Sequence, residues 1–352
     1  PRSEQIYFIG ATNVPLERLD PALLRPGRMG RHIWFRTPTS DDRADIFDLY
    51  LGRVAHDPDL DRPERRDELA SVTGGYSPAM IEQVCSMALT YAHADGRPHF
   101  SWPDIVEAIT TVETGTAQNV QYVAAESRAT AIHEAGHAVT SHLYLSNQMH
   151  TRLSIRKRGG SLGHYQRREI EERFSAWRHE DMGELVMTLG AMAAEHVFYG
   201  ENSRGVGGDV QQATTLAALL VGVWAMGPEP IDLTGRVAED VREEREKEIT
   251  ERFERIGMRI LNRAQGGAFM GDNIGAILGD PYKRRAAAVI LGQAYLTGLA
   301  CVRHNRDAVA QIADTLVERK ELFGSEVDQL MRRADLQAPE IDVLDETLWP
   351  KV

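Results

Sequence analysis

Cysteine is nearly absent from this 352-residue sequence, since Cys85 and Cys301 are its only cysteines and form no C-x-x-C pair. The sequence therefore indicates neither a disulfide framework nor a thiolate metal site, and a reducing compartment fits best. Long apolar runs are also missing. The longest, from Leu216 to Met226, is about half of the roughly 20 residues that a membrane helix needs, so we expect no membrane-spanning segment.

Positive charge is in deficit, because 40 Lys and Arg residues face 52 Asp and Glu residues and leave a net charge of -12 at pH 7. Nucleic-acid binding needs a concentrated basic surface, so we expect no nucleic-acid partner. With 42% hydrophobic and 26% charged residues, the composition is typical of a folded chain of two or three domains. We expect no signal peptide at the start of this sequence. The chain begins with Pro1 directly before the strand-like "IYFIG", so we expect the later part of a longer polypeptide.

Two short apolar segments near the start, Ile6–Ile9 and His32–Phe35, are typical of strands. A polar, proline-rich loop separates them, which predicts the edge of an α/β domain over residues 1–39. From residue 40 the periodicity becomes helical, and we expect helices over 41–52, 64–73, 77–94 and 102–114. These helices predict a small helical domain over residues 40–117, ended by the polar stretch "TGTAQNVQ".

Residues 118–352 predict a third, mainly helical domain with a small β element. Two short strands are expected at Leu153–Arg156 and Ser161–Gln166, followed mostly by helices to about Leu336. Residues 235–264 form a strongly charged helix with an apolar face, composed of Val237, Val241, Ile249, Phe253, Ile256 and Ile260. Two interpretations stay open, namely a surface helix packed on its own domain, which we favour, and a helix that binds a partner.

The stretch "TAIHEAGHAVTSHLY" carries the clearest chemical pattern. Residues four apart lie on one face of a helix, so His133 and His137 can direct two imidazoles at one tetrahedral Zn²⁺. Glu134 lies beside the first histidine, where its carboxylate can take a proton from zinc-activated water and pass it to a leaving amine. This is the H-E-x-x-H arrangement of metallopeptidases. We interpret the other histidines, among them His142, His150, His164 and His179, as structural.

A catalytic zinc site takes three protein ligands, and two carboxylates are candidates for the third. Glu195 lies in the helical stretch "GELVMTLGAMAAEHVFYG", and Asp209 follows a glycine-rich loop in "RGVGGDVQQATTLAALL". Asp209 could instead be a helix N-cap, because Gln212 stands three residues later as in a capping box. Spacing alone does not separate the two candidates.

With these motifs in place, the sequence resembles the FtsH family of ATP-dependent, membrane-anchored zinc proteases over nearly its whole length. The segment "ATNVPLERLDPALLRPGRMGRHI" is similar to a long family motif near the end of the AAA+ ATPase core, and "GGYSPAMIEQVCSMAL" is similar to its lid motif. "HEAGHAV", "GGSLGHY", "LGAMAAEHVFYG" and "GVGGDVQQAT" resemble successive segments of the peptidase domain. The resemblance implies the C-terminal part of an AAA+ core over 1–39, the lid over 40–117 and the peptidase domain over 118–352.

The resemblance also implies roles for particular residues. Asp209 becomes the third zinc ligand, and Glu195 becomes a residue that could orient an imidazole. Asn13 matches the polar sensor for ATP hydrolysis, and Arg25 and Arg28 match arginine fingers that reach the nucleotide of a neighbouring subunit. Such fingers imply a homo-oligomeric ring, which in the family is a hexamer. The strand at 160–165 is where an unfolded protein substrate could add to the sheet edge.

The sequence departs from the family in one decisive respect. No G-x-x-x-x-G-K-[ST] motif occurs, so ATP and Mg²⁺ are expected only with an upstream ATPase half or a neighbouring subunit. Gly208 stands where the metal loop of the family has Asn, and residues 235–264 have no family counterpart that aligns. The resemblance implies membrane attachment through upstream segments, at the cytoplasmic side of the bacterial inner membrane. Two alternatives stay open: a non-hydrolysing assembly partner that supplies arginine fingers, and an ATP-independent zinc peptidase.

Overall fold

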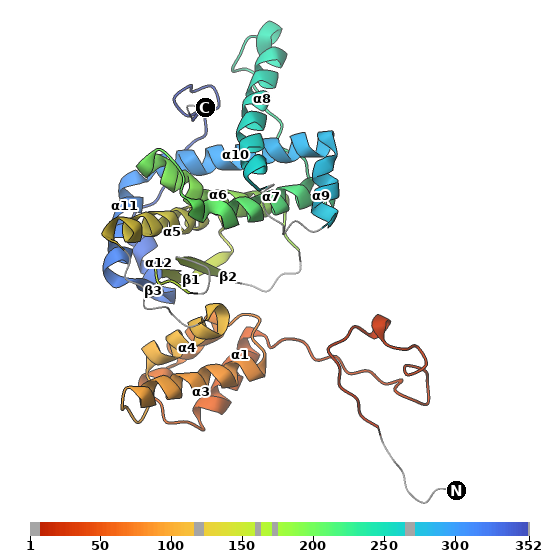
Figure 1. Ribbon diagram of the computed structural model, residues 1–352, viewed down its shortest axis with the longest axis vertical. Coiled ribbons are helices and arrows are strands. Elements are labelled where there is room, and N and C mark those ends of the chain that lie inside the picture. Colours follow the sequence, from red (N-terminus) through yellow and green to blue (C-terminus); the bar gives the residue numbers. More distant parts are fainter. Residues whose placement is uncertain (1–7, 116–122, 159–162, 171–174, 265–271, 351–352) are drawn as a thin grey trace, which may run out of the picture.

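The computed structural model describes residues 8–115, 123–158, 163–170, 175–264 and 272–350. Within this part of the chain two separate hydrophobic cores occur, one among four helices before residue 115 and one in everything after residue 123. Figure 1 shows the small helical bundle lying beneath the β-sheet of the larger C-terminal domain. The predicted boundary near residue 117 lies outside the described residues, and the identity of the segments as AAA+ core and lid stays a prediction.

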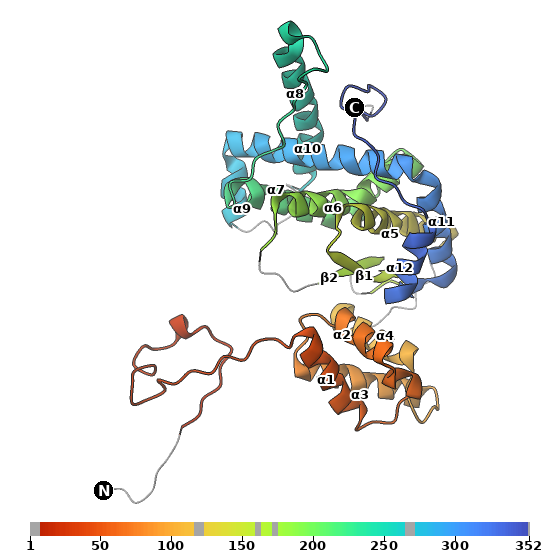
Figure 2. The ribbon, with the colours of Figure 1, turned by 180° about the vertical axis from the view of Figure 1, so that it is seen from behind.

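Residues 8–39 form an extended segment that leads away from the bundle (Figures 1 and 2). Its one regular element in the described part is a 3₁₀ turn at Leu16–Arg18. The expected strand at His32–Phe35 is wrong, because that stretch pairs with no other strand and its apolar side chains are exposed, with Phe35 at 93%. A strand needs a neighbour to satisfy its backbone groups and to cover its apolar face. The other expected strand, Ile6–Ile9, lies mostly outside the described residues.

The bundle is built from helices α1 (Ser40–Leu51), α2 (Pro63–Val72), α3 (Pro78–Ala94) and α4 (Trp102–Thr114). These confirm the four predicted helices to within a residue at each end. Local capping explains where three of them begin. Thr39 and Ser101 each form a capping box with the aspartate three residues later, and the Ser77 side chain accepts a hydrogen bond from the Met80 amide.

The C-terminal domain places a three-stranded antiparallel sheet against a stack of helices. The sheet order is β2-β1-β3, with β1 at Gln148–Ser154, β2 at His164–Glu169 and β3 at Glu321–Phe323. The first two strands confirm the predicted β element, although β1 begins and ends earlier in the chain than the predicted strand at 153–156. Residues 161 and 162 of the second predicted strand lie outside the described residues. Strand β3 was not predicted, because three residues are too few to show an alternating pattern.

The helices of this domain are α5 (Ala124–Tyr144), α6 (Arg178–Tyr199), α7 (Gly207–Gly222), α8 (Glu239–Ala264), α9 (Asp272–Gly279), α10 (Pro281–His304), α11 (Arg306–Arg319) and α12 (Gly324–Arg333). Helix α10 is long and apolar enough to cross a membrane, but 78% of its most apolar window is buried inside the protein. It therefore behaves as the central core helix. Gln293 interrupts the apolar run of this helix, so the helix contains no long uninterrupted apolar stretch that the sequence would reveal.

Helices α5 and α6 cross with their backbones almost in contact. A Cβ atom added to Gly136 of α5 would lie 2.7 Å from both the Gly190 carbonyl oxygen and the Ala194 Cβ atom of α6. A Cβ atom on Gly190 would in turn overlap the Thr140 side chain. Gly183 of α6 likewise faces the Tyr144 carbonyl oxygen of α5, 2.5 Å from where its Cβ atom would lie, so these three glycines determine the relative position of α5 and α6 tightly.

Helix α8 is the charged amphipathic helix that the sequence predicts. Its C-terminal half packs on α10, with Phe253 and Ile260 buried, and its N-terminal half projects beyond the domain with Val241 44% exposed (Figures 1 and 2). Packing on its own domain is therefore confirmed for the second half of the helix. The two helices touch where Gly257 faces the Ala288 carbonyl and Gly292 faces the Phe253 carbonyl.

Replacing Gly257 by alanine should destabilise the C-terminal domain. The new methyl group would overlap the Ala288 carbonyl, so the two helices must separate, and overpacking of this kind costs about 1–3 kcal/mol. Thermal and urea unfolding followed by circular dichroism measure the effect. Gly275→Ala in α9 is the matched control, because nothing lies within 4 Å of its added Cβ atom. Equal stability of the two variants would show that α8 and α10 do not touch as described.

Candidate metal centre

The centre is formed by one face of α5 and the first turn of α7. His133 and His137 project side by side from α5, with ring centroids 5.0 Å apart. The Asp209 carboxylate of α7 faces both rings: Oδ2 lies 3.2 Å from His133 Nε2 and Oδ1 lies 3.3 Å from His137 Nε2. These three residues each offer one ligand atom, and the atoms lie within 4.8 Å of one another. The structure thus brings together the three residues named as ligands.

The interpretation of Asp209 as a helix N-cap is wrong. Helix α7 begins at Gly207, with Val206 in the N-cap position and no side-chain cap, so Asp209 is the third residue of the helix. The reason is local, because residues Arg204–Val206 already form a 3₁₀ turn that carries the chain into α7 early. The carboxylate is therefore available to face the imidazoles.

Glu195 of α6 lies behind His133 rather than beside the ligand atoms. Its Oε1 atom lies 2.9 Å from His133 Nδ1 and accepts a hydrogen bond from the Ser203 hydroxyl at 2.9 Å. Its Oε2 atom accepts from the Ser203 amide at 2.6 Å. Because Nδ1 and Nε2 point in different directions from the ring, Glu195 faces away from the point where Asp209 meets the two histidines.

The hydrogen bonds of the two rings assign their tautomers. His133 Nδ1 faces the Glu195 carboxylate, and His137 Nδ1 lies 2.9 Å from the Met187 carbonyl oxygen, which can only accept. Each Nδ1 therefore carries a proton and donates it, so that in the neutral form of each ring the lone pair lies on Nε2, where a metal ion would replace the second proton. Metal-binding histidines commonly show this arrangement, so the residues fit a zinc ion.

The charges of the site also call for a cation. Three carboxylates, those of Glu134, Glu195 and Asp209, surround two imidazoles in a largely buried space. Burial opposes the charge of Asp209, but the two histidines outweigh it and hold the pKa of its carboxyl well below the usual range. Burial likewise opposes protonation of His133, yet hydrogen bonds to Asp209 and Glu195 raise the pKa of its imidazole to about 10. A divalent cation would balance this negative field in place of protons.

Glu134 is 5% exposed and lies against the start of β2. Burial raises the pKa of its carboxyl, and the nearby His133 and His137 oppose that rise. A Cβ atom on Gly163 would lie 2.5 Å from Glu134 Oε1, so the backbone here approaches the carboxylate as closely as a glycine permits. Because burial disfavours the charged carboxylate, Glu134 is suited to accept and hold a proton.

Several functional neighbours carried no signal in the sequence. The Met187 carbonyl and Ser203 lie far from the motif along the chain, and neither residue type suggests a role in supporting an imidazole. Tyr165 of β2 stacks on His137 at a centroid distance of 6.5 Å. His142 Nδ1 lies 3.2 Å from His150 Nε2, and neither residue belongs to the group of possible metal ligands found among the described residues. Their interpretation as structural stays a prediction.

The three residues assigned to nucleotide contact lie elsewhere. Asn13, Arg25 and Arg28 are exposed and belong to the extended segment 8–39, which leads away from the bundle (Figure 1). Arg28 donates a hydrogen bond to the Ala22 carbonyl at 2.9 Å, within the same loop. The structure does not bring them together with the zinc ligands, and their roles stay predictions.

Comparison with known proteins finds one matching family and several similar proteins. Peptidase family M41 matches residues 121–257, a span that contains His133, Glu134, His137 and Asp209. The chain is 28% identical over 333 residues to an ATP-dependent zinc metalloprotease FtsH 3 of Symbiobacterium thermophilum, covering 94% of this chain and 49% of that protein. It is 34% identical over 227 residues to an FtsH 1 of Rhodopirellula baltica, covering 64% and 33%. The chain spans about half the length of the first of these curated relatives.

Replacing Asp209 should reduce the zinc content of the protein more than replacing Glu195. Asp209→Ala removes a ligand and should leave little bound zinc, whereas Glu195→Ala removes only the acceptor of His133 Nδ1 and should weaken zinc binding about 10- to 100-fold. Zinc per chain, measured by mass spectrometry after dialysis against buffered zinc, reports both. Glu201→Ala is the control, since this exposed glutamate lies outside the cluster. If Asp209→Ala binds as much zinc as the wild type and Glu195→Ala binds none, then Glu195 is the third ligand and Asp209 is not.

Proposed function

Because the chain belongs to the FtsH family of zinc metalloproteases, we propose that it is a zinc-dependent endopeptidase with Glu134 as the general base. The observation that carries this proposal is a pair of hydrogen bonds: His133 Nδ1 donates to Glu195, and His137 Nδ1 donates to the Met187 carbonyl oxygen. The Nε2 atom of each ring then faces Asp209, and the three possible ligand atoms lie within 4.8 Å of one another. When bound there, Zn²⁺ supplies Lewis-acid activation of a water molecule and of the scissile carbonyl.

The protein's own residues then handle the proton. Glu134 takes a proton from the attacking water on its carboxylate and later gives it to the leaving amine, so that the peptide bond breaks with no net change at Glu134. Its burial favours the protonated intermediate state, because desolvation disfavours the charged carboxylate. Glu195 and Ser203 keep the His133 ring from turning, and the Met187 carbonyl does the same for His137.

We also propose the wider role that the family resemblance implies. The substrates are unfolded or membrane proteins, and cleavage depends on ATP in a homo-oligomeric, hexameric ring. The ATP and Mg²⁺ sites belong to a further part of the polypeptide or to a neighbouring subunit. Asn13 contributes to them as a polar sensor, and Arg25 and Arg28 contribute as arginine fingers. The ring lies at the cytoplasmic side of the bacterial inner membrane. The names of the curated relatives as ATP-dependent zinc metalloproteases support ATP dependence.

Glu134→Gln tests the assigned chemistry. The amide keeps the shape of the side chain but cannot accept the proton, so we expect cleavage of unfolded casein or a quenched peptide to fall about 10²- to 10⁴-fold with zinc retained. Glu126→Gln, on an exposed face of the same helix, should keep full activity. An unimpaired Glu134→Gln variant would sink the mechanism, whereas an inactive wild type that still raises the ATPase rate of an intact ring would favour the assembly-partner alternative.

Gly163→Ala tests the close approach of β2 to the base. The added methyl group would press on the Glu134 carboxylate, and a displacement of about 1 Å can cost about 10²-fold in rate. We therefore expect a lower kcat with unchanged zinc content. Gly208→Ala is the control, because its Cβ atom meets nothing within 4 Å although it stands next to Asp209. A normal kcat in Gly163→Ala would show that the strand does not constrain Glu134.

A further inference from the structure

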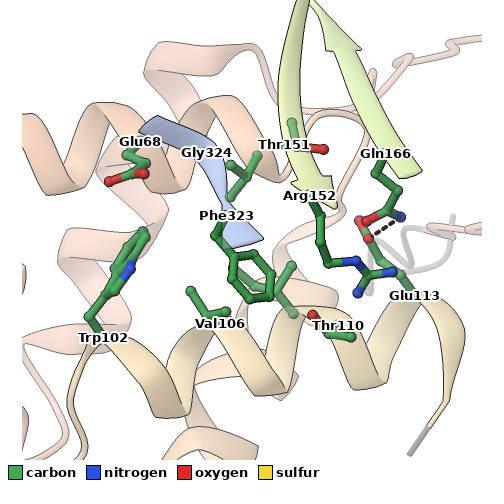
Figure 3. Close-up of a pocket in the computed structure, with 12 residues that line it drawn as sticks. Glu68, Trp102, Val106, Thr110, Glu113, Thr151, Arg152, Gln166, Phe323 and Gly324 are labelled. Carbon is green, nitrogen blue, oxygen red and sulfur yellow. Dashed lines mark hydrogen bonds between the residues drawn. The ribbon is translucent and has the colours of Figure 1, made fainter. Parts of the chain in front are cut away.

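A small cavity lies between the α1–α4 bundle and the β-sheet, and neither the three candidate zinc ligands nor Glu134 line it (Figure 3). Helices α2 and α4 form one wall, with Trp102 and Val106 among the lining residues, and the sheet forms the other, with Phe323 of β3. The cavity holds about 20 Å³, which is enough for one water molecule or one ion of similar size. It is the place where the two folded parts of the chain meet.

Arg152 of β1 points into this cavity (Figure 3). Its side chain is the largest of those that are fully buried, with an exposure of 1%. Within the described residues none of its three guanidinium nitrogens has a hydrogen-bond partner. Burial lowers the pKa of this guanidinium, and the nearby Glu321 and Glu113 oppose that shift. A buried guanidinium whose donors find no acceptor costs several kcal/mol, so this one calls for a ligand.

The carboxylates around Arg152 are engaged by other residues. Glu113 of α4 accepts hydrogen bonds from Gln166 at 2.6 Å and from Arg168 at 2.8 Å. Glu107 accepts from Arg158 at 2.8 Å. These pairs join the bundle to the sheet.

Glu321 of β3 is the remaining carboxylate of the group, and its Oε2 atom lies 3.5 Å from Arg158 and 3.7 Å from Arg156. Its Oε1 atom has no partner among the described residues, and no hydrogen bond joins it to Arg152.

The charges of this cluster leave one positive charge in excess. Its four guanidinium groups belong to Arg152, Arg156, Arg158 and Arg168, and its three carboxylates belong to Glu107, Glu113 and Glu321. A further carboxylate in the cavity lining, that of Glu68, is paired with Arg65 at 2.8 Å, and this pair adds no net charge. A water molecule in the cavity would accept at most two hydrogen bonds and bring no charge. An anion of halide size accepts from several donors at once and cancels the excess.

We propose that a small monovalent inorganic anion of halide size occupies this cavity against the Arg152 guanidinium and holds the bundle on the sheet. The anion belongs to neither unit alone, because α4 and β1 each supply part of its surroundings. Its presence stabilises the contact between the two parts of the chain. The proposal does not depend on the zinc centre or on peptidase activity.

The first test is thermal unfolding of the full chain in sodium chloride or sodium bromide against sodium gluconate at equal ionic strength. The wild type should show a saturable rise of a few degrees in Tm with either halide, as expected for a ligand that binds only the folded state. Arg152→Gln, which keeps most of the side-chain volume but has no charge, should lose this rise. Arg285→Gln is the control, since this exposed arginine lies outside the cluster and does not line the cavity, so this variant should keep the rise.

The second test is anomalous diffraction from crystals of the wild type in bromide. An anomalous peak in contact with the Arg152 guanidinium is expected, and it decides the question even if Arg152→Gln does not fold. A cavity that holds only water in bromide would overturn the proposal. An equal halide effect in the wild type and in Arg152→Gln, or no saturable effect in the wild type, would overturn it as well.

Discussion

The close crossing of α5 and α6 is the constraint on which the candidate site depends. Gly136 and Gly190 let the two backbones approach to a distance that no side chain would allow. At this separation α6 supplies two acceptors to the α5 histidines, the Glu195 carboxylate and the Met187 carbonyl. Within the H-E-x-x-H segment, Gly136 therefore serves packing, while His133, Glu134 and His137 serve chemistry. A larger residue at Gly136 would move both rings away from their acceptors at once.

The electrostatics of the site follow from the same packing. Once α5, α6 and α7 are together, three carboxylates share a small, largely buried space with two imidazoles. Without a cation this group is balanced only by protons on the rings, which is why the pKa of His133 is raised so far above its ordinary value. The ion-free arrangement and the zinc-bound arrangement thus compete for the same two nitrogen atoms, and proton uptake opposes metal uptake.

The sequence predicts the helical parts well because each carries its own signals. The caps at Thr39, Ser77 and Ser101 and the spacing of His133 and His137 are local, and the structure agrees with them. Features that depend on distant contacts were missed. The lone strand predicted at 32–35 has no partner, β3 is too short to show a period, and Glu195 and Asp209 could not be ranked by spacing. Their difference lies in which ring nitrogen each one faces, and only the tertiary arrangement of three helices decides that.

The candidate ligands come from two helices that are far apart in the chain, since Asp209 follows His137 by 209 − 137 = 72 residues. An ion bound between them would act as a removable cross-link, closing a long loop much as a disulfide does in an oxidising compartment. The only two cysteines of the chain, Cys85 and Cys301, are buried and form no disulfide. A metal ion bound between α5 and α7 would therefore restrain these helices without any cysteine. Chelation would then release the first turn of α7 from α5 while the glycine-packed pair of α5 and α6 stays together.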